Sequence, residues 1–284
     1  MIDGIRVEDG KYGRRAVATS AWSEEMTDYL LDNGIVELEL NVAKGWRGND
    51  LLFLAKLPQL QSFEILDHRF PSVDPIHFLR ELRSLKVETY CRTEIRFSAF
   101  PRLEQCALEW RPKATSLFDC TTLRKLFVNC YKGQDVAPFA RLVNLESLAI
   151  LNGPAKNLRG LAALQRLRSL RLALLRRLTS LAGIEGLANL EELVITTCRA
   201  LGPIEEIGSL SRLRKLQLDN NGDIESLKPL EKLSALEWVF FTGSSNIHDG
   251  DLSPLLRLKN LSRLSFQNRR HYSHRREEFA AFYG

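Results

Sequence analysis

The sequence of 284 residues predicts an α/β repeat solenoid, with a curved parallel β-sheet on its concave face and 3₁₀ or short helical segments on its convex face. Three observations predict it. A motif of the form L-x-x-L-x-L recurs eleven times, its copies begin 20 to 25 residues apart, and three consecutive copies share identical offsets. Such self-similarity is typical of stacked units that cannot bury their apolar side alone. We therefore expect about eleven repeats with a cap at each end.

The copies of the motif differ in regularity along the chain. Four weaker copies come first and begin at Ile35, Leu60, Leu82 and Leu103. Seven clearer copies follow and begin at Leu123, Leu145, Leu167, Leu190, Leu213, Leu236 and Leu261. The units that start at Leu167, Leu190 and Leu213 agree at eight successive positions. Chance does not produce that agreement, so the repeat is a property of the fold.

Each half of a repeat has its own period. The x-L-x-L-x segment alternates with period two, which is typical of a short strand with one buried face. The second half places an apolar residue at every third position, which favours a 3₁₀ turn because side chains at i and i+3 align there. Asn221 falls at the corner between the halves, where a side-chain amide can bond the turning backbone, and Cys198 takes this position one unit earlier.

A leucine-rich coiled coil is the competing fold, because Leu158, Leu161, Leu164 and Leu167 are evenly spaced. A coiled coil needs a mean spacing of about 3.5 residues and no helix breakers. Here glycine and proline recur throughout the regular repeats, for example at Pro154, Gly183 and Pro203. The solenoid is therefore favoured.

The predicted organisation has three parts. Residues 1–34 form an N-terminal segment and helical cap, 35–268 the repeat array, and 269–284 a C-terminal cap. The array is degenerate to about residue 120 and regular after it. The segment 23–34 predicts a short helix, with Ser23 as N-cap and Gly34 as its stop.

Aromatic and apolar residues are expected to close both ends. Those at the N-terminal end are Met26, Tyr29 and Leu30, and those at the C-terminal end are Phe279, Phe282 and Tyr283. Residues 1–20 could add an edge strand or stay loose.

Two segments carry a resemblance to a known family. Residues 247–264 and 224–236 each contain an Ile, then Leu-x-Pro-Leu, then the next Leu. This pattern resembles the leucine-rich-repeat family, in the short 22-residue class of bacterial internalins and a regulatory subunit of protein phosphatase type 1. The resemblance implies a curved parallel sheet and a binding role. The chain departs from the family at the corner, where Gly153, Leu175 and Ser244 replace the usual Asn.

Composition favours a cytoplasmic protein. The five cysteines are scattered and form no C-x-x-C pair, which disfavours disulfides and zinc ribbons. No run approaches the roughly 18 apolar residues that span a bilayer, and the N-terminus lacks the apolar core of a secretory signal. The arginine-rich basic composition fits a GC-rich bacterial genome. The sequence does not indicate an oligomeric state.

No pattern predicts catalysis, and we expect no catalytic residue, no metal and no cofactor. The chain lacks G-x-S-x-G, Walker, H-E-x-x-H and G-x-G-x-x-G motifs. His271 and His274 could share a helical face, but no further ligand completes a metal site there. The segment 219–225 superficially resembles a calcium loop, yet lacks the Gly and Glu that such a loop needs. Cys106 replaces a core leucine and is expected to be a buried hydrophobe.

The repeat register predicts which side chains point outward from the sheet. The first repeats present an acidic row made of Glu37, Glu39, Glu64, Glu88 and Glu109. Further along, aromatic, apolar and charged residues form the predicted partner-binding set: Trp238, Phe240, Phe127, Arg171, Val194, Lys215, Asp219 and Arg263. Aromatic side chains among cations are typical of the energetic centre of a protein interface. Alternatively, Trp238 and Phe240 pack under the loop 243–250.

The sequence therefore predicts a non-catalytic module that recognises another protein through its concave face. Bacterial partner-neutralising (immunity-type), effector and scaffold roles all fit. The alternative is polyanion or nucleic-acid binding through two basic clusters, Lys156–Arg177 and Arg269–Arg276. Nucleic acid is the disfavoured partner, because those cations fall mostly on convex or loop positions without interleaved aromatics. No membrane partner is expected.

Overall fold

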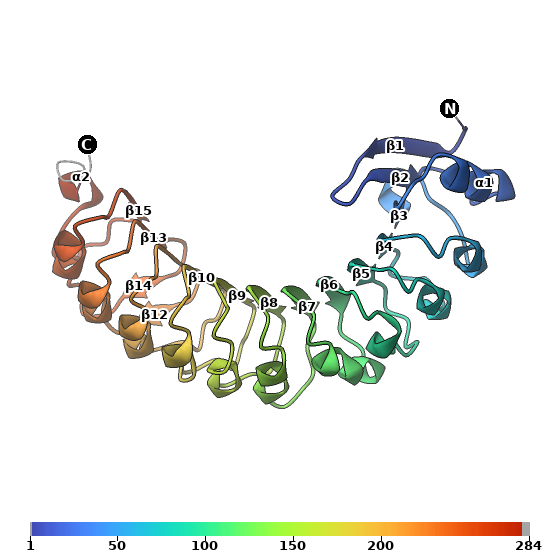
Figure 1. Ribbon diagram of the computed structural model, residues 1–284. Coiled ribbons are helices and arrows are strands. Elements are labelled where there is room, and N and C mark those ends of the chain that lie inside the picture. The colour runs from blue at the N-terminus through green and yellow to red at the C-terminus, as the bar shows by residue number, and fades with distance from the viewer. Residues whose placement is uncertain (1, 280–284) are drawn as a thin grey trace. The chain divides into compact units, whose positions relative to one another are not determined.

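The computed structural model describes residues 2–279 and contains two compact units, Met1–Val128 (unit 1) and Asn129–Gly284 (unit 2). Each unit is a leucine-rich-repeat solenoid. Within each unit the strands line the inner, concave side and the 3₁₀ turns line the outer side (Figure 1). We call the inner, solvent-facing side of the strands the strand face.

Unit 1 opens with an antiparallel pair and continues as a parallel sheet. Its elements are β1 (Ile5–Asp9), β2 (Arg14–Ala18), α1 (Glu24–Asp32), β3 (Glu37–Asn41), β4 (Ser62–Leu66), β5 (Ser84–Glu88), β6 (Gln105–Glu109) and β7 (Lys125–Asn129), where the unit ends. β2 pairs in parallel with β3, and the parallel order continues through β4, β5 and β6. The register aligns Leu38, Phe63, Leu85 and Cys106 on the buried side.

Unit 2 is regular throughout. Its elements are β8 (Ser147–Leu151), β9 (Ser169–Ala173), β10 (Glu192–Thr196), β11 (Lys215–Asp219), β12 (Asp223–Ile224), β13 (Trp238–Phe241), β14 (Asn246–Ile247), β15 (Arg263–Phe266) and α2 (Arg276–Phe279). β8, β9, β10, β11, β13 and β15 pair in parallel in that order, and β12 pairs with β14. Leu170, Leu193 and Leu216 share one register position and are fully buried.

The fold expected from the repeat is confirmed. Each of the eleven predicted strand positions is a strand in the part of the chain that the structure describes. The segments with three-residue spacing are 3₁₀ turns, as their period predicts. The turns are Val42–Lys44, Leu52–Lys56, Asp74–Phe78, Phe97–Ala99 and Pro112–Asp119 in unit 1, and Ala137–Arg141, Arg159–Leu161, Ile184–Gly186, Glu205–Ser209, Lys228–Lys232 and Ser253–Arg257 in unit 2.

The corner after each of β7, β8, β9, β10, β11 and β13 contains a left-handed residue. Positive φ angles recur at Cys130, Asn152, Leu174, Thr197 and Asn220, and then at Gly243. All six occupy the same position of the repeat, one residue before the corner. Left-handed backbone is costly for residues with a Cβ. The stacked repeats therefore impose this conformation even where the sequence offers no glycine.

Asn221 acts as the corner residue that the repeat predicts. It is fully buried, its Oδ1 accepts the backbone N–H of Cys198 at 2.9 Å, and its Nδ2 donates to the carbonyl of Ile195 at 2.8 Å. One repeat later the expected corner residue, Ser244, is exposed instead. Ser245 takes the role: its buried hydroxyl donates to the Leu218 carbonyl and accepts the Asn221 N–H. The insertion after β13 shifts the corner by one residue.

The termini add elements outside the repeats. The predicted helix is present as α1, where Ser23 Oγ accepts the N–H of Met26, and both Met26 and Leu30 are buried. Residues before it form the β1–β2 hairpin. At the other end Phe279 of α2 is 1% exposed and packs edge-on against Phe266 at 5.8 Å. Phe282 and Tyr283, expected to share this role, lie outside the described residues.

Candidate functional site

The strand face of unit 2 gathers most of the predicted binding residues. Lys215, Trp238 and Arg263 share one register position on β11, β13 and β15, and they stand in a row across three neighbouring strands. Phe240 lies two residues beyond Trp238, so it points to the same face. The two rings meet edge-to-face, with centroids 6.1 Å apart, and both side chains are half-buried.

Cations flank the indole of Trp238. The Arg263 guanidinium lies 4.1 Å from the ring centroid, and the Lys215 ammonium lies at 5.8 Å. Both distances are within the range of attractive cation–π contacts. Arg263 is exposed and makes no ion pair with any residue that the structure describes. We call Lys215, Trp238, Phe240 and Arg263 the aromatic cluster.

A polar row fixes one edge of the aromatic cluster. Lys215 Nζ forms an ion pair with Glu192 at 2.7 Å, and Ser169 Oγ donates to the same carboxylate at 2.9 Å. Burial alone would raise the pKa of Glu192, but hydrogen bonds from Lys215 and Ser169, with the charges of Lys215 and Arg171, lower it below its ordinary value. Lys215 is therefore held toward Glu192, whereas the Arg263 guanidinium contacts the Trp238 ring.

Three further predicted residues, Asp219, Arg171 and Phe127, lie outside the aromatic cluster. Asp219, at the end of β11, accepts the Thr242 N–H at 2.9 Å and the Thr242 hydroxyl at 2.7 Å, so much of its bonding capacity is used internally. Arg171 on β9 is exposed, and its side chain makes no hydrogen bond with the described residues. Phe127 lies on β7, in unit 1, and is not a member of the aromatic cluster.

Val194 is a correction to the sequence-based set. It has the predicted register, between Arg171 and Gln217, but it is only 5% exposed. Val194 therefore offers little surface to a partner.

The acidic row of unit 1 is also less available than its register predicts. Glu37 and Glu39 point to the strand face but are 3% and 2% exposed. Glu39 forms ion pairs with Arg15 and, at 2.6 Å, with Lys44, and Arg15 also reaches Glu64 at 3.1 Å. Burial alone would raise the pKa of Glu39, but bonds from Lys44, Asn41 and Arg15 lower it below its ordinary value. Glu39 and Glu64 are therefore paired with cations within the unit.

The β1–β2 hairpin covers this row, which sequence reasoning missed. The backbone N–H of Tyr12, at the hairpin tip, donates to Glu37. Its hydroxyl accepts a hydrogen bond from Gln105 of β6 at 2.9 Å, and the Arg83 guanidinium lies 4.5 Å from its ring centroid. The only signal was the Asp9-Gly10 pair between two alternating segments, which is a hairpin pattern.

Among residues 2–279, no group of three or more His, Cys, Asp or Glu could hold a metal ion. The two histidines with helical spacing bond different partners: His271 contacts the Ile247 carbonyl at 3.0 Å, and His274 contacts the Ser273 hydroxyl at 2.8 Å. Cys106 is buried, and burial raises the pKa of its thiol well above the ordinary range. Within the same residues no helix is both long and apolar enough to cross a membrane.

The two basic clusters are partly used by the fold. In the first, Arg168 pairs with Glu191 at 3.0 Å, whereas Arg176 and Arg177 are exposed and flank a hollow of about 430 Å³ next to Gly153 and Leu174. In the second, Arg269 donates to the carbonyls of Gly243 and Ser245 at 3.2 and 3.0 Å. Arg269 thus stabilises the loop after β13.

Solved structures share this fold. An internalin from Listeria monocytogenes aligns with a TM-score of 0.61 and 20% identity, over 90% of this chain and 83% of that chain. A TDR receptor aligns with a TM-score of 0.62 and 16% identity, over 87% of this chain and 45% of the receptor. The plant peptide hormone receptor RGFR1, in complex with RGF2, aligns with a TM-score of 0.50 and 14% identity, over 93% of this chain and 52% of that chain.

Sequence comparison adds no family. No protein-family model matches the chain, and no curated protein matches it by sequence. At identities of 14 to 20% the structural likeness shows the fold alone. The chain therefore has the leucine-rich-repeat solenoid fold that these structures share.

Proposed function

We propose that the protein is a non-catalytic recognition module that binds another protein through the strand face of unit 2. The observation that carries the proposal is the aromatic cluster, in which two half-exposed rings meet on a face whose apolar core lies on the opposite side of the sheet. Tryptophan and arginine are among the residues enriched in interface hot spots.

Charge indicates the kind of partner. Arg263 and Arg171 are exposed and lack ion pairs among the described residues, whereas the carboxylates Glu192 and Asp219 are already bonded. The face therefore presents positive charge around aromatic rings. It fits a partner segment that combines carboxylates with apolar side chains.

The fold supports this proposal without identifying the partner. RGFR1, which shares the fold, was solved in complex with RGF2. A module of this type would serve as a bacterial partner-neutralising (immunity-type), effector or scaffold protein. Its cytoplasmic location and its resemblance to the protein phosphatase regulatory subunit stay predictions.

The test is a pull-down with immobilised protein from native extract, comparing wild type with the Trp238→Ala/Phe240→Ala variant. A matched control, Phe78→Ala/Tyr90→Ala, removes two aromatic side chains that are 53% and 65% exposed in unit 1. Because a hot-spot side chain contributes about 2 kcal/mol or more, the first variant should bind its partner about 100-fold more weakly or worse. The control should bind like wild type.

Salt separates the two classes of partner. An aromatic-centred protein interface should survive about 0.5 M salt, whereas binding through phosphate contacts should fall steeply. Nucleic acid that all three proteins retain equally, and that salt removes, would refute the proposal and assign the function to the basic clusters.

A further inference from the structure

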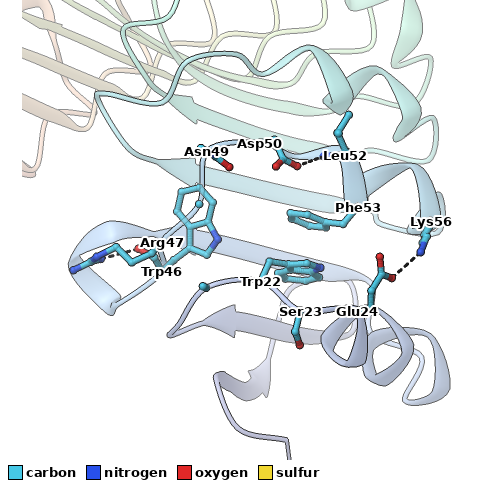
Figure 2. A pocket seen from close by; sticks show the side chains of 12 residues that line it. Trp22, Ser23, Glu24, Trp46, Arg47, Asn49, Asp50, Leu52, Phe53 and Lys56 are labelled. Carbon is cyan, nitrogen blue, oxygen red and sulfur yellow. Dashed lines mark hydrogen bonds and ion pairs between the residues drawn. The ribbon is translucent and has the colours of Figure 1, made fainter.

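A pocket in unit 1 lies outside the strand face. It has a volume of about 460 Å³, and its walls come from residues 21–24 at the start of α1, residues 46–50 of the following loop, and the turn at residues 52–56 (Figure 2). None of these residues belongs to a paired strand of the sheet. The pocket is therefore separate from the aromatic cluster of unit 2.

Stacked rings form one wall. Trp22 and Phe53 lie almost parallel, with centroids 3.9 Å apart and planes 12° apart, and each is half-buried. Trp22 Nε1 donates to the Thr27 hydroxyl at 3.0 Å, which fixes the orientation of its ring. Beside them, Glu24 and Lys56 form an ion pair of 2.6 Å (Figure 2). The wall is thus a fixed apolar platform with a polar edge.

Trp46 forms the opposite wall and carries an unsatisfied donor. The residue is fully buried, and its Nε1 has no hydrogen-bond partner among residues 2–279. In Figure 2 the indole nitrogen is on the side of the ring that faces Trp22 and Phe53. A buried indole N–H normally has a partner, so this donor points to an acceptor that a ligand would supply.

The loop over Trp46 is built to hold the indole in place. A Cβ on Gly48 would lie 2.8 Å from a carbon of the Trp46 ring, so only glycine lets the chain pass this close. Arg47 donates to the carbonyls of Val42 and Trp46 at 2.8 and 2.7 Å, and Asp50 accepts the Leu52 N–H at 3.0 Å. The walls are therefore ordered by internal bonds.

The pocket lining contains equal numbers of negatively and positively charged side chains. Glu24 and Asp50 carry negative charge, Arg47 and Lys56 carry positive charge, and Asn49 and Ser23 add neutral donors and acceptors. A net anion or a net cation would meet like charge on one side. A neutral ligand with several hydroxyl groups meets complementary partners on all sides.

We propose that this pocket binds a neutral saccharide of one or two sugar units. Its size is within the range of small-ligand sites, which combine apolar walls with a few orienting polar groups. The C–H groups of the sugar pack against the exposed part of the stacked Trp22–Phe53 pair, and a sugar oxygen accepts the Trp46 Nε1–H. Asn49 and Asp50 bond further hydroxyls at the rim.

The experiment is NMR of the ¹⁵N-labelled protein, which reports one indole N–H signal from each of its four tryptophans. The probes are glucose, galactose, mannose, N-acetylglucosamine and their neutral β-linked disaccharides. At least one should move the Trp46 signal downfield in a saturable way and leave Trp238 unmoved. If no probe at about 50 mM moves the Trp46 signal, or if Trp238 moves instead, the proposal fails.

Variants assign the effect to the pocket. Phe53→Ala removes one platform ring and Asn49→Ala removes a rim amide, and each should weaken binding about tenfold. Phe78→Ala is the matched control for loss of an exposed ring, and it should bind like wild type. Equal affinities in all four proteins would overturn the assignment.

The saccharide proposal and the protein-binding proposal can be tested independently. The Trp238→Ala/Phe240→Ala variant should keep full saccharide affinity, because the pocket belongs to unit 1. Loss of saccharide binding in that variant would contradict the pocket, whatever the outcome for the protein partner.

Discussion

The strand faces of the two units use the same repeat in opposite ways. In unit 1 the outward carboxylates are paired with Arg15 and Lys44 and lie under the β1–β2 hairpin. In unit 2 the outward rings of Trp238 and Phe240 stay half-exposed beside the exposed guanidinium of Arg263. The repeat fixes the direction in which a side chain points. Whether that side chain remains available depends on segments outside the repeat.

This contrast predicts that arginine substitutions act differently in the two units. Arg15→Ala leaves Glu39 nearly buried with one cation fewer, so it should lower the free energy of unfolding by about 2–3 kcal/mol. Arg171→Ala removes an exposed side chain and should change it by less than about 0.5 kcal/mol. Urea unfolding followed by circular dichroism measures both. Equal losses in the two variants would show that the faces do not differ.

Acid should weaken the same interaction in unit 1. The folded-state pKa of Glu39 is lowered by Lys44, Asn41 and Arg15 despite burial, so its ionised form stabilises the fold. That contribution is present above the ordinary carboxylate pKa of about 4.5 and is lost as the pH falls through the lower folded value. Unfolding measured between pH 7 and pH 3 should therefore show a smaller pH dependence in Glu39→Gln than in wild type. An unchanged pH profile would mean that other carboxylates carry the effect.

The backbone conformations of the two units also differ, and we expect a smaller effect on the free energy of unfolding from this difference. The described residues of unit 1 have positive φ only at glycines, whereas unit 2 has five other residues in this conformation. Thr197, with φ of 57°, is among them, and Thr196 beside it lies in strand β10. Thr197→Gly should stabilise the protein by about 1 kcal/mol, because it removes the left-handed penalty. Thr196→Gly should destabilise it by a similar amount, and the same sign for both would contradict the origin of the strain.

Much of the fold could be predicted from the sequence, because the apolar residues that the fold buries recur at regular spacings. The period-two and period-three segments locate the strands and the 3₁₀ turns, and Asn221 follows from its place between them. The left-handed turns were not predictable, since Leu174 and Thr197 have no local preference for that conformation. Ser245 was missed because an insertion shifted the corner by one residue.

The candidate site was predictable only in part. Alternation indicates that Trp238, Phe240 and Glu39 face outward, but it carries no information about what lies in front of them. The contact between Tyr12 and Gln105 joins residues 93 positions apart, and no local pattern reports it. For the same reason, local patterns do not predict that Val194 is buried. They also do not predict the pocket around Trp46, whose walls come from three separate segments.

The direction of β1 has a consequence for how the protein behaves at high concentration. The edge strand of an open parallel sheet has unpaired backbone N–H and C=O groups. A strand of another copy can pair with them and extend the sheet. β1 runs antiparallel to β2, so the parallel repeat of the sheet ends at β2 on this side. Arg6 and Glu8 add charge to that edge. The hairpin thus ends the stack of parallel strands with a short charged strand, which disfavours edge-to-edge pairing with a second copy.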